Sequence, residues 1–408
     1  MNDASRSPSF EGRAYGTVLS LFAGAGGLDI GLEAAGLQTL AYLENNEDCR
    51  ATLERNRPSW KRLEPGDAVE AARTTRARDL GLSVGELDVV AAGPPCQPFS
   101  SAAQWRSSGR LGMADDRAAT VHATIDLVRA FQPRVLLIEN VVGFLRADHG
   151  AVAVLRAGLD EINRDCKTRY ALDYAVVDAA SYGVPQHRRR AIVVASREGR
   201  ALSLPQPTHR DKPISAWDAI GDLPEPDEDP MPLGTWARNL LPSVPEGGNY
   251  QWLTAKGGGE ELFGYRTRYW SFLLKLARDR PSWTLSASAG PSTGPFHWNN
   301  RQLTVRERLR LQSFPDSWRV AGSTRAQVRM AGNATPPLLA EVIGRALVSQ
   351  LVDQDAEFGA LPELLRRRWA RVPQPVDPVP VPARLRFLIG KKSAHPGAGQ
   401  GPSPRVVD

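Results

Sequence analysis

Short apolar runs alternate with amphipathic stretches along the first half of the chain. The apolar runs have the length of buried strands and predict strands at residues 17–22, 39–43, 89–92, 135–138, 174–177 and 191–195. Helical spacing of apolar residues predicts helices at 28–35, 120–131 and 152–163. Strands that alternate with helices favour an α/β fold built on a mostly parallel sheet.

The pattern changes after residue 197. Between 198 and 299, prolines, glycines and tryptophans are frequent and the alternation of strand and helix disappears. We expect a second, smaller domain there, either irregular or β-rich. Helical spacing returns at 302–314 and at 338–351.

Both ends of the chain differ in composition from the rest. Residues 1–14 are polar, and we expect a disordered leader. Residues 353–408 contain the run Arg366-Arg367-Arg368, a Pro-Val repeat and a Gly/Pro/Ser-rich end. This composition predicts a basic, partly extended tail, whose deletion we expect to leave activity intact.

Polar residues stand where the first two predicted strands end. A glycine-rich turn at 23–27 follows the first strand, and Glu44 ends the second. A glycine-rich turn into a helix, with an acidic residue about 20 positions later, is typical of a site for a nucleotide-type cofactor. Each feature alone has a simpler interpretation, as a tight turn and a solvated carboxylate. Asp67, which precedes a stretch compatible with a helix, similarly reads as a helix N-cap.

Cys96 follows the strand at 89–92 after Gly93, Pro94 and Pro95. Because prolines cannot continue a strand ladder and fix the backbone, the cysteine is aimed from the carboxyl edge of the sheet, where open α/β sheets bind ligands. Glu139 ends the strand at 135–138, so a carboxyl and a thiol are expected in one crevice. The alternative is that Cys96 is only a small buried hydrophobe.

Composition narrows the class of protein without naming an activity. The chain has 408 residues, a net charge of +6 and only three cysteines. The length predicts two domains, and the positive charge permits a polyanionic partner. No apolar run is long enough for a membrane span, and no signal-peptide core is present, so we expect a cytoplasmic protein. The cysteines form no CxxC pair, so we expect neither a disulfide framework nor a metal site.

Several segments, in a fixed order, resemble the DNA (cytosine-5) methyltransferases of the prokaryotic restriction–modification type. These segments are 22–27 (FAGAGG), 93–100 (GPPCQPFS), 139–141 (ENV), 186–190 (QHRRR), 301–307 (RQLTVRE) and 332–337 (GNATPP). The resemblance implies an S-adenosylmethionine-dependent methyltransferase with a Rossmann-like sheet. It implies a catalytic and cofactor-binding domain at 15–197, a target-recognition domain at 198–322, and a return to the catalytic domain at 323–352.

The resemblance also implies roles for individual residues. Cys96 would be the nucleophile, Glu139 the catalytic acid, and Arg188 and Arg190 would lie at the target base. Cofactor contacts would come from Phe22, Gly24, Gly26, Gly27, Glu44, Asn45, Asp67, Pro94, Asn333 and Thr335. DNA contacts would come from Gln97, Ser100, Thr284 and Leu285. Thr335 departs from the family, which often has valine or serine there, and the polar loop at 101–119 is longer than in the shortest members.

The chemistry needs these residue types. Cytosine C5 becomes nucleophilic when a thiolate adds to C6, which pushes charge toward N3 and O2. A protonated Glu139, whose pKa burial would raise, would donate a proton or a hydrogen bond to N3. Arg188 would stabilise charge at O2 and help to keep Cys96 ionised. The base must leave the duplex to reach the thiol.

Other functions were weighed against this hypothesis. An RNA methyltransferase usually carries a Cys-Phe-Thr signature in its second domain, and all three cysteines here precede residue 170. A non-catalytic DNA-binding regulator typically loses the nucleophile or the acid, and both are present. The glycine-rich turn fits a nicotinamide oxidoreductase poorly. We expect double-stranded DNA as partner, a monomer because no heptads occur, and room for a separate cognate restriction endonuclease.

Overall fold

The computed structural model describes residues 14–96, 99, 113, 118–146, 150–227, 231–265, 270–288, 290–365 and 371–390. Its centre is a seven-stranded sheet with the order β3-β2-β1-β4-β5-β7-β6. The strands are β1 (Gly16–Leu21), β2 (Leu37–Leu43), β3 (Lys61–Arg62), β4 (Val89–Ala92), β5 (Val135–Val141), β6 (Ala171–Asp178) and β7 (Arg189–Ser196). The five neighbouring strands β3, β2, β1, β4 and β5 are parallel, and β7 runs antiparallel to both β5 and β6. The predicted α/β fold is confirmed, as are the six predicted strands; β3, which is short and exposed, carries no apolar signal.

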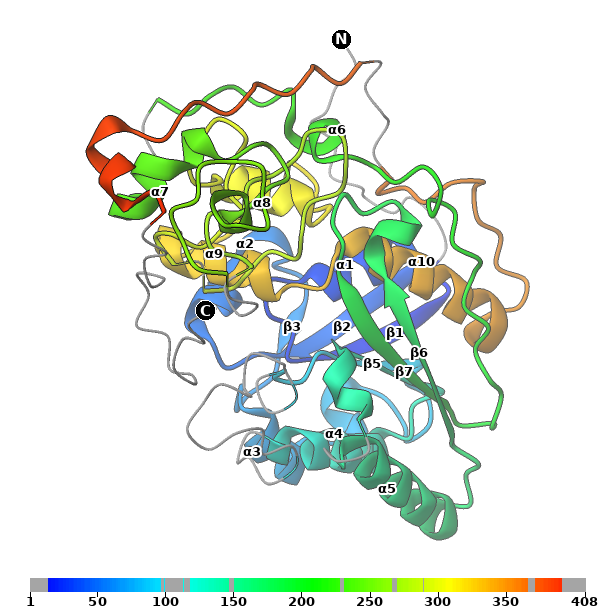
Figure 1. Cartoon of the computed structure of the whole chain (residues 1–408). Helices are drawn as coiled ribbons and strands as arrows, with labels where there is room; N and C mark the ends of the chain where they lie inside the picture. Colours follow the sequence, from blue (N-terminus) through cyan, green and yellow to red (C-terminus); the bar gives the residue numbers. More distant parts are fainter. Residues whose placement is uncertain are drawn as a thin grey trace.

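Helices cover both faces of the sheet (Figure 1). On one face lie α3 (Ala68–Thr74), α4 (Ala119–Phe131) and α5 (Ala151–Cys166), and on the other α1 (Gly27–Ala34) and α10 (Pro337–Leu347). The other α-helices are α2 (Glu47–Asn56), α6 (Ala216–Ile220), α7 (Thr235–Leu240), α8 (Val305–Leu311) and α9 (Thr324–Asn333). Alternate residues of a strand face opposite sides, so Leu19 packs with α3, α4 and α5, whereas Val18 packs with α1 and α10. Burial on both faces explains why these strands read as continuous apolar runs.

Helix α10 returns the end of the chain to the sheet beside α1. The two helices approach so closely that a Cβ on Gly31 would lie 2.3 Å from the carbonyl oxygen of Pro337 and 2.4 Å from Cβ of Ala340. Only glycine fits this contact. The predicted helix at 338–351 is therefore confirmed as α10, which one π-helical turn extends over Val348–Val352.

Residues 198–303, here called the second region, have their own apolar clusters. One contains Tyr250, Phe263 and Phe296, and the other contains Leu276 and Leu285. Outside the named strands, the described residues form three isolated bridges, all of which involve this region. Of the two expectations, the region is irregular rather than β-rich. Its short helices α6 and α7 were not predicted, because five or six residues are too few to show helical periodicity.

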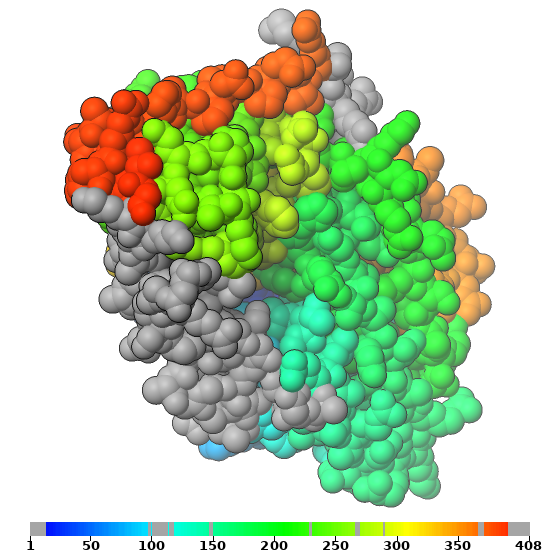
Figure 2. Space-filling model, viewed as in Figure 1, coloured from blue at the N-terminus to red at the C-terminus, as the bar shows by residue number. Residues whose placement is uncertain are grey.

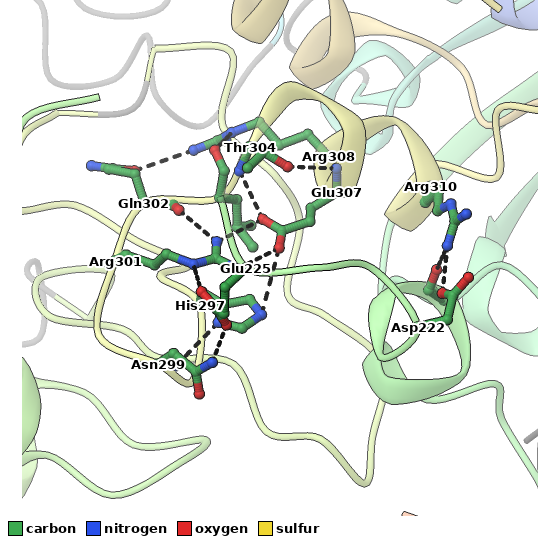
Figure 3. A network of polar contacts seen from close by, with 12 residues as sticks. Asp222, Glu225, His297, Asn299, Arg301, Gln302, Thr304, Glu307, Arg308 and Arg310 are labelled. Atoms are coloured by element: carbon green, nitrogen blue, oxygen red, sulfur yellow. Dashed lines mark hydrogen bonds and ion pairs between the residues drawn. The ribbon is translucent and has the colours of Figure 1, made fainter. Parts of the chain in front are cut away.

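A buried polar network fastens the second region to α8 (Figure 3). The Arg301 guanidinium donates to both carboxylate oxygens of Glu307, at 2.9 and 2.7 Å, and to Glu225 at 2.6 Å. Glu307 also accepts from the backbone N–H of Thr304, which completes a capping box at the start of α8. Because these buried groups satisfy one another, the chain turns from the second region into α8 in one defined way.

Helix α8 and the segment after it pack into the sheet half. Leu309, Phe314 and Trp318 share an apolar cluster with Ala25 and Leu53, which belong to the first half of the chain. The indole N–H of Trp318 donates to the carbonyl of Ala25 at 3.0 Å. This part of the predicted recognition segment at 198–322 therefore contacts the predicted cofactor half directly.

Residues 371–390, here called the C-terminal segment, lie along the outside of the second region, in orange to red in Figure 1. Val381 is buried in the cluster that contains Phe263, and the N–H of Val379 donates to the carbonyl of Pro242. Gly390 donates to Glu261, and Arg278 donates to the carbonyl of Gln374. Within this segment, Ala383–Leu388 form a 3-10 helix and residues 371–382 have no regular secondary structure. The segment is therefore attached to the second region at several points along its length.

Candidate active site

A cavity of about 460 Å³ opens at the carboxyl ends of β1, β2, β4 and β5. Figure 2 shows the molecule hollowed between the yellow-green part of the chain and the green and cyan part, with blue atoms of the first strands at the floor. Parallel strands bring their ends to one edge of a sheet, so turns far apart in the sequence meet here. The cleft is the predicted crevice.

The glycine-rich turn forms one end of the cleft, where Phe22, Gly24 and Gly27 line it. Phe22 and Gly24 have positive φ angles of 59° and 58°, and the space on the Cβ side of Gly24 is open to 3.9 Å. Both oxygens of Glu44 accept backbone bonds, from Gly24 at 2.8 Å and Asn46 at 2.7 Å. Each carboxylate oxygen keeps a free lone pair, so Glu44 remains able to accept from a ligand hydroxyl.

The other residues expected near a cofactor take different positions. Asn45 and Asp67 line the cleft. Asp67 also caps α3 by accepting from the N–H groups of Val69 and Glu70, so the N-cap interpretation is confirmed, and its contact with a cofactor stays a prediction. Gly26 lies behind the turn, where an added Cβ would come within 2.9 Å of Leu53 and Trp318. We therefore assign Gly26 to the packing of the turn.

The cleft is also lined by Pro94, from the loop after β4. Asn333, at the end of α9, and Thr335, in the turn before α10, line it as well. A Cβ on Gly27 would lie 2.1 Å from the carbonyl oxygen of Thr335, so the glycine lets this turn approach α1. Backbone forms much of this side of the cleft.

Cys96 lies in the cleft immediately after the two prolines. The loop is held on one side by the side-chain amide of Asn140, which donates to the carbonyl of Pro94 at 3.0 Å. On the other side, buried Phe99 packs edge-on against Phe144 at 4.9 Å. Burial raises the pKa of the Cys96 thiol, and the positive charge of Arg190 opposes this shift more strongly than that of Arg188.

The two predicted arginines have different environments. Arg190 pairs with Glu139, with its Nε 2.9 Å from Oε1. Arg188 is fully buried and donates to the carbonyls of Gly332 and Asn333 at 3.0 and 3.2 Å. Burial, and the nearby charge of Arg190, lower the pKa of Arg188 to about 9.

The roles that the resemblance implied for Arg188, at O2 of the base and in keeping Cys96 ionised, remain predictions. The charges of both Arg190 and Arg188 oppose the rise in the pKa of Cys96. Arg188 also fastens the end of α9 to the cleft through the carbonyls of Gly332 and Asn333. Local sequence could not distinguish the two arginines, because the carbonyl groups that Arg188 contacts lie more than 140 positions further along the chain.

Thr284 and Leu285 line the cleft from the second region. Their position is fixed by the segment around Gln186, whose side-chain oxygen accepts from the N–H of Leu285 at 3.1 Å. The hydroxyl of Thr284 donates to the carbonyl of His187 at 2.6 Å. The two other residues expected at DNA, Gln97 and Ser100, lie outside the described residues, as does most of the loop at 101–119.

Two residues at the cleft were not predicted to act there. Asn140 lies inside a recognised segment, so only its bond to Pro94 gives it a part in the site. Asp29 lines the cleft from the first turn of α1, where burial raises its pKa to about 7. The sequence did contain a signal for Asp29, because it is a carboxylate between the apolar residues Leu28 and Ile30 at the start of a predicted helix.

The described part of the chain holds no group of three or more His, Cys, Asp or Glu side chains placed to bind a metal ion. None of its helices is both long and apolar enough to cross a membrane.

Comparisons with known proteins agree with the geometry. Residues 16–349 match the model of the C-5 cytosine-specific DNA methylases. The Type II methyltransferase M.SacI of Streptomyces achromogenes is 36% identical over 382 residues, which cover 85% of this chain and 96% of the relative. M.Eco47II of Escherichia coli is 33% identical over 354 residues, covering 82% of this chain and 79% of the relative.

A solved structure supports the fold. The Entamoeba histolytica methyltransferase EhMeth superposes with a TM-score of 0.56 at 15% identity, covering 85% of this chain and all of that one. The family match covers most of the chain and includes every segment that lines the cleft. The chain therefore belongs to the C-5 cytosine-specific DNA methylases and is a DNA (cytosine-5) methyltransferase.

Proposed function

We propose that the cleft methylates a cytosine that has left a DNA duplex, through a covalent bond between Cys96 Sγ and C6 of the base. The supporting observation is the meeting of Cys96, Glu139 and Arg190 beside the glycine-rich turn. The Cys96 thiolate adds to C6, and the electron pair of the C5–C6 double bond moves toward C5 and the N3–O2 system. Arg190 lies beside both the thiol and the carboxylate, so its charge favours the thiolate and the developing negative charge.

Glu139 serves the N3 side of the base. Its carboxyl group lies at the end of β5, paired with Arg190, and it holds or donates the proton at N3 as negative charge builds up there. After C5 has gained its methyl group, the C5 proton passes to water, and the electron pair of the broken C5–H bond re-forms the C5–C6 double bond and expels the Cys96 thiolate. Arg188 and Asn140 act as positioning residues, because each ties a backbone segment of the cleft in place.

The cofactor half of the cleft fits S-adenosylmethionine. Glu44 has acceptor capacity for ribose hydroxyls, and the open backbone at Gly24 and the polar residues Asn45 and Asp67 line the same space. When bound, S-adenosylmethionine supplies an electrophilic methyl carbon. The side chains of Asn333 and Thr335, with Pro94, complete the enclosure, and Thr335 is compatible with this role because it lines the cleft.

We propose that the second region reads a specific sequence in double-stranded DNA, with Thr284 and Leu285 at its junction with the cleft, and that residues 15–197 form the catalytic domain. The Type II names of the relatives support a role as the modification enzyme of a restriction–modification system. We further propose that the protein acts as a cytoplasmic monomer, with a cognate endonuclease acting separately.

The test is methyl transfer from tritiated S-adenosylmethionine to mixed-sequence duplex DNA. Wild-type protein is expected to label 5-methylcytosine at one short sequence, which base-resolved mapping identifies. Cys96→Ser is expected to give no label while retaining the unfolding temperature of wild type. Label on RNA would favour the RNA methyltransferase, and binding to DNA without label would favour the regulator.

A further inference from the structure

Two tryptophans are exposed at the mouth of the cleft. The side chains of Trp270 and Trp283 are 43% and 39% exposed, although most large apolar side chains of the described second region are buried. Their ring centroids lie 5.6 Å apart with an interplanar angle of 72°. The imidazole of His187 lies beside Trp283, with its centroid at 6.2 Å. Exposed aromatic rings gathered at one place point to a binding surface.

The backbone holds these rings in position. Segment 282–285 runs beside segment 185–187, with bonds from Ser282 N–H to the carbonyl of Pro185 and from His187 N–H to the carbonyl of Ser282. Trp283 is directly followed by Thr284, which lines the cleft, so the ring lies next to the cleft mouth.

The partner rings are also anchored. The carbonyl of Trp270 accepts from the side-chain amide of Asn249 at 2.6 Å, and Phe272, two residues later, is buried. His187 Nδ1 lies 3.0 Å from a carboxylate oxygen of Asp178, which fixes the imidazole. The rings are therefore oriented before any partner binds, which lowers the entropy cost of binding.

The same segment presents positive charge. His187 and Arg189 are exposed, whereas Arg188 and Arg190 face inward, as alternation along the start of β7 requires. Aromatic rings beside an arginine at the mouth of a cleft for DNA suit a nucleic-acid base, since every base has a flat face that stacks and the neighbouring phosphate is negative.

We propose that Trp283 and Trp270, with His187, form a stacking surface for a base of the target duplex that becomes unstacked when the cytosine leaves the helix. This inference rests on the proposed flipping of the cytosine. Flipping removes stacking from the flanking bases and leaves the partner base unpaired, at a cost of a few kcal/mol. Contact with the exposed base offsets part of this cost, so the tryptophans act in DNA binding and flipping rather than in the chemical step.

The test starts from the methylated sequence found by mapping the product of the wild-type protein. A fluorescent duplex with that sequence is titrated, in the presence of S-adenosylhomocysteine, with wild type, Trp283→Ala, Trp283→Phe and Trp270→Ala. Tyr174→Ala, which removes an exposed ring on β6, is the matched control. We expect Trp283→Ala to raise Kd for the duplex by about 5- to 100-fold. Trp283→Phe is expected to restore most of the affinity, and Tyr174→Ala to leave it unchanged.

Two further duplexes identify the base. One has an abasic site opposite the target cytosine, and the other has an abasic site next to it on the target strand. If the tryptophans stack on one of these bases, the difference in Kd between wild type and Trp283→Ala disappears with the corresponding duplex. Equal Kd values for wild type and both alanine variants would overturn the proposal. A loss of affinity that persists with both abasic duplexes would also overturn it, because it would show a structural role.

The outcomes separate this inference from the proposed function. Absence of methylation by wild type would refute the proposed function before any tryptophan variant is made. Methylation by wild type together with wild-type DNA affinity in Trp283→Ala and Trp270→Ala would leave the function intact and refute the stacking surface. Since Trp270 and Trp283 belong to different segments, failure of one variant to fold leaves the other as the test.

Discussion

Replacing Glu307 with glutamine is expected to destabilise the protein strongly. Glu307 and Arg301 are both almost fully buried, and the guanidinium donates to both carboxylate oxygens. Glutamine retains one acceptor oxygen, so it can still accept from Thr304, but its amide group would face the donors of Arg301. The variant leaves a buried cation without its main countercharge.

The structure sets the size of the loss. Removing one partner of a buried ion pair costs about 3–5 kcal/mol of the free energy of unfolding. Glu225 still contacts Arg301 Nε at 2.6 Å, but its carboxylate is 55% exposed and therefore compensates only in part. We expect a value near the lower end, about 3 kcal/mol.

Urea unfolding followed by circular dichroism measures this loss. Glu161→Gln is the matched control, because the Glu161 carboxylate pairs with Arg129 at 3.4 Å while 58% exposed. Exposed pairs of this kind contribute about 0–1 kcal/mol. Equal stability of the two variants would refute the claim that burial makes the Arg301–Glu307 pair structurally essential. The double variant Arg301→Met/Glu307→Leu is expected to recover part of the loss, since it leaves neither charge alone.

Three further predictions follow from other contacts. Burial and the charges of Arg301 and Arg278 lower the pKa of His297 to about 2 from 6.5. Below pH 6.5 the unfolded chain therefore binds more protons at His297 than the folded chain, and we expect unfolding in urea to become easier as the pH falls. The slope is up to about 1.4 kcal/mol per pH unit, and His297→Gln should remove it. Gly332→Ala places a Cβ 2.5 Å from the backbone of Ala287 at the cleft and should lower methyl transfer by about 10- to 100-fold, whereas Gly359→Ala, which meets no atom within 4 Å, should have no effect. A chain that ends at residue 390 should keep full activity and stability, whereas one that ends at residue 370 should unfold at a lower urea concentration; equal midpoints would contradict the packing of Val381. This loss of stability is compatible with the expectation that deletion of the tail leaves activity intact.

Local patterns predicted the sheet half well. Buried parallel strands are continuous apolar runs. The two prolines before Cys96 end β4, which places the cysteine at the carboxyl edge of the sheet. The second region was predicted only as irregular or β-rich, because its order depends on pairs such as Arg301 with Glu225, 76 positions apart. Periodicity carries no information about such pairs.

Within the cleft, too, some features could be predicted from the sequence and others could not. The positions of Cys96, Glu44 and Glu139 follow from the ends of strands, and the structure brings them into one cavity. The different environments of Arg188 and Arg190 depend on contacts with distant parts of the chain, since Arg188 meets the carbonyls at the end of α9 and Arg190 meets Glu139 at the end of β5. Only the assembled fold supplies that information.

The C-terminal segment has a consequence for engineering sequence specificity. A natural design would exchange residues 198–303 between related enzymes, in order to move recognition of one DNA sequence onto another catalytic half. Such a graft would leave behind Val381 and the backbone partners of Pro242 and Glu261. The transplanted region would then expose an apolar seam and unpaired carbonyls. A working chimaera must therefore take its recognition module from two separate stretches of the donor gene.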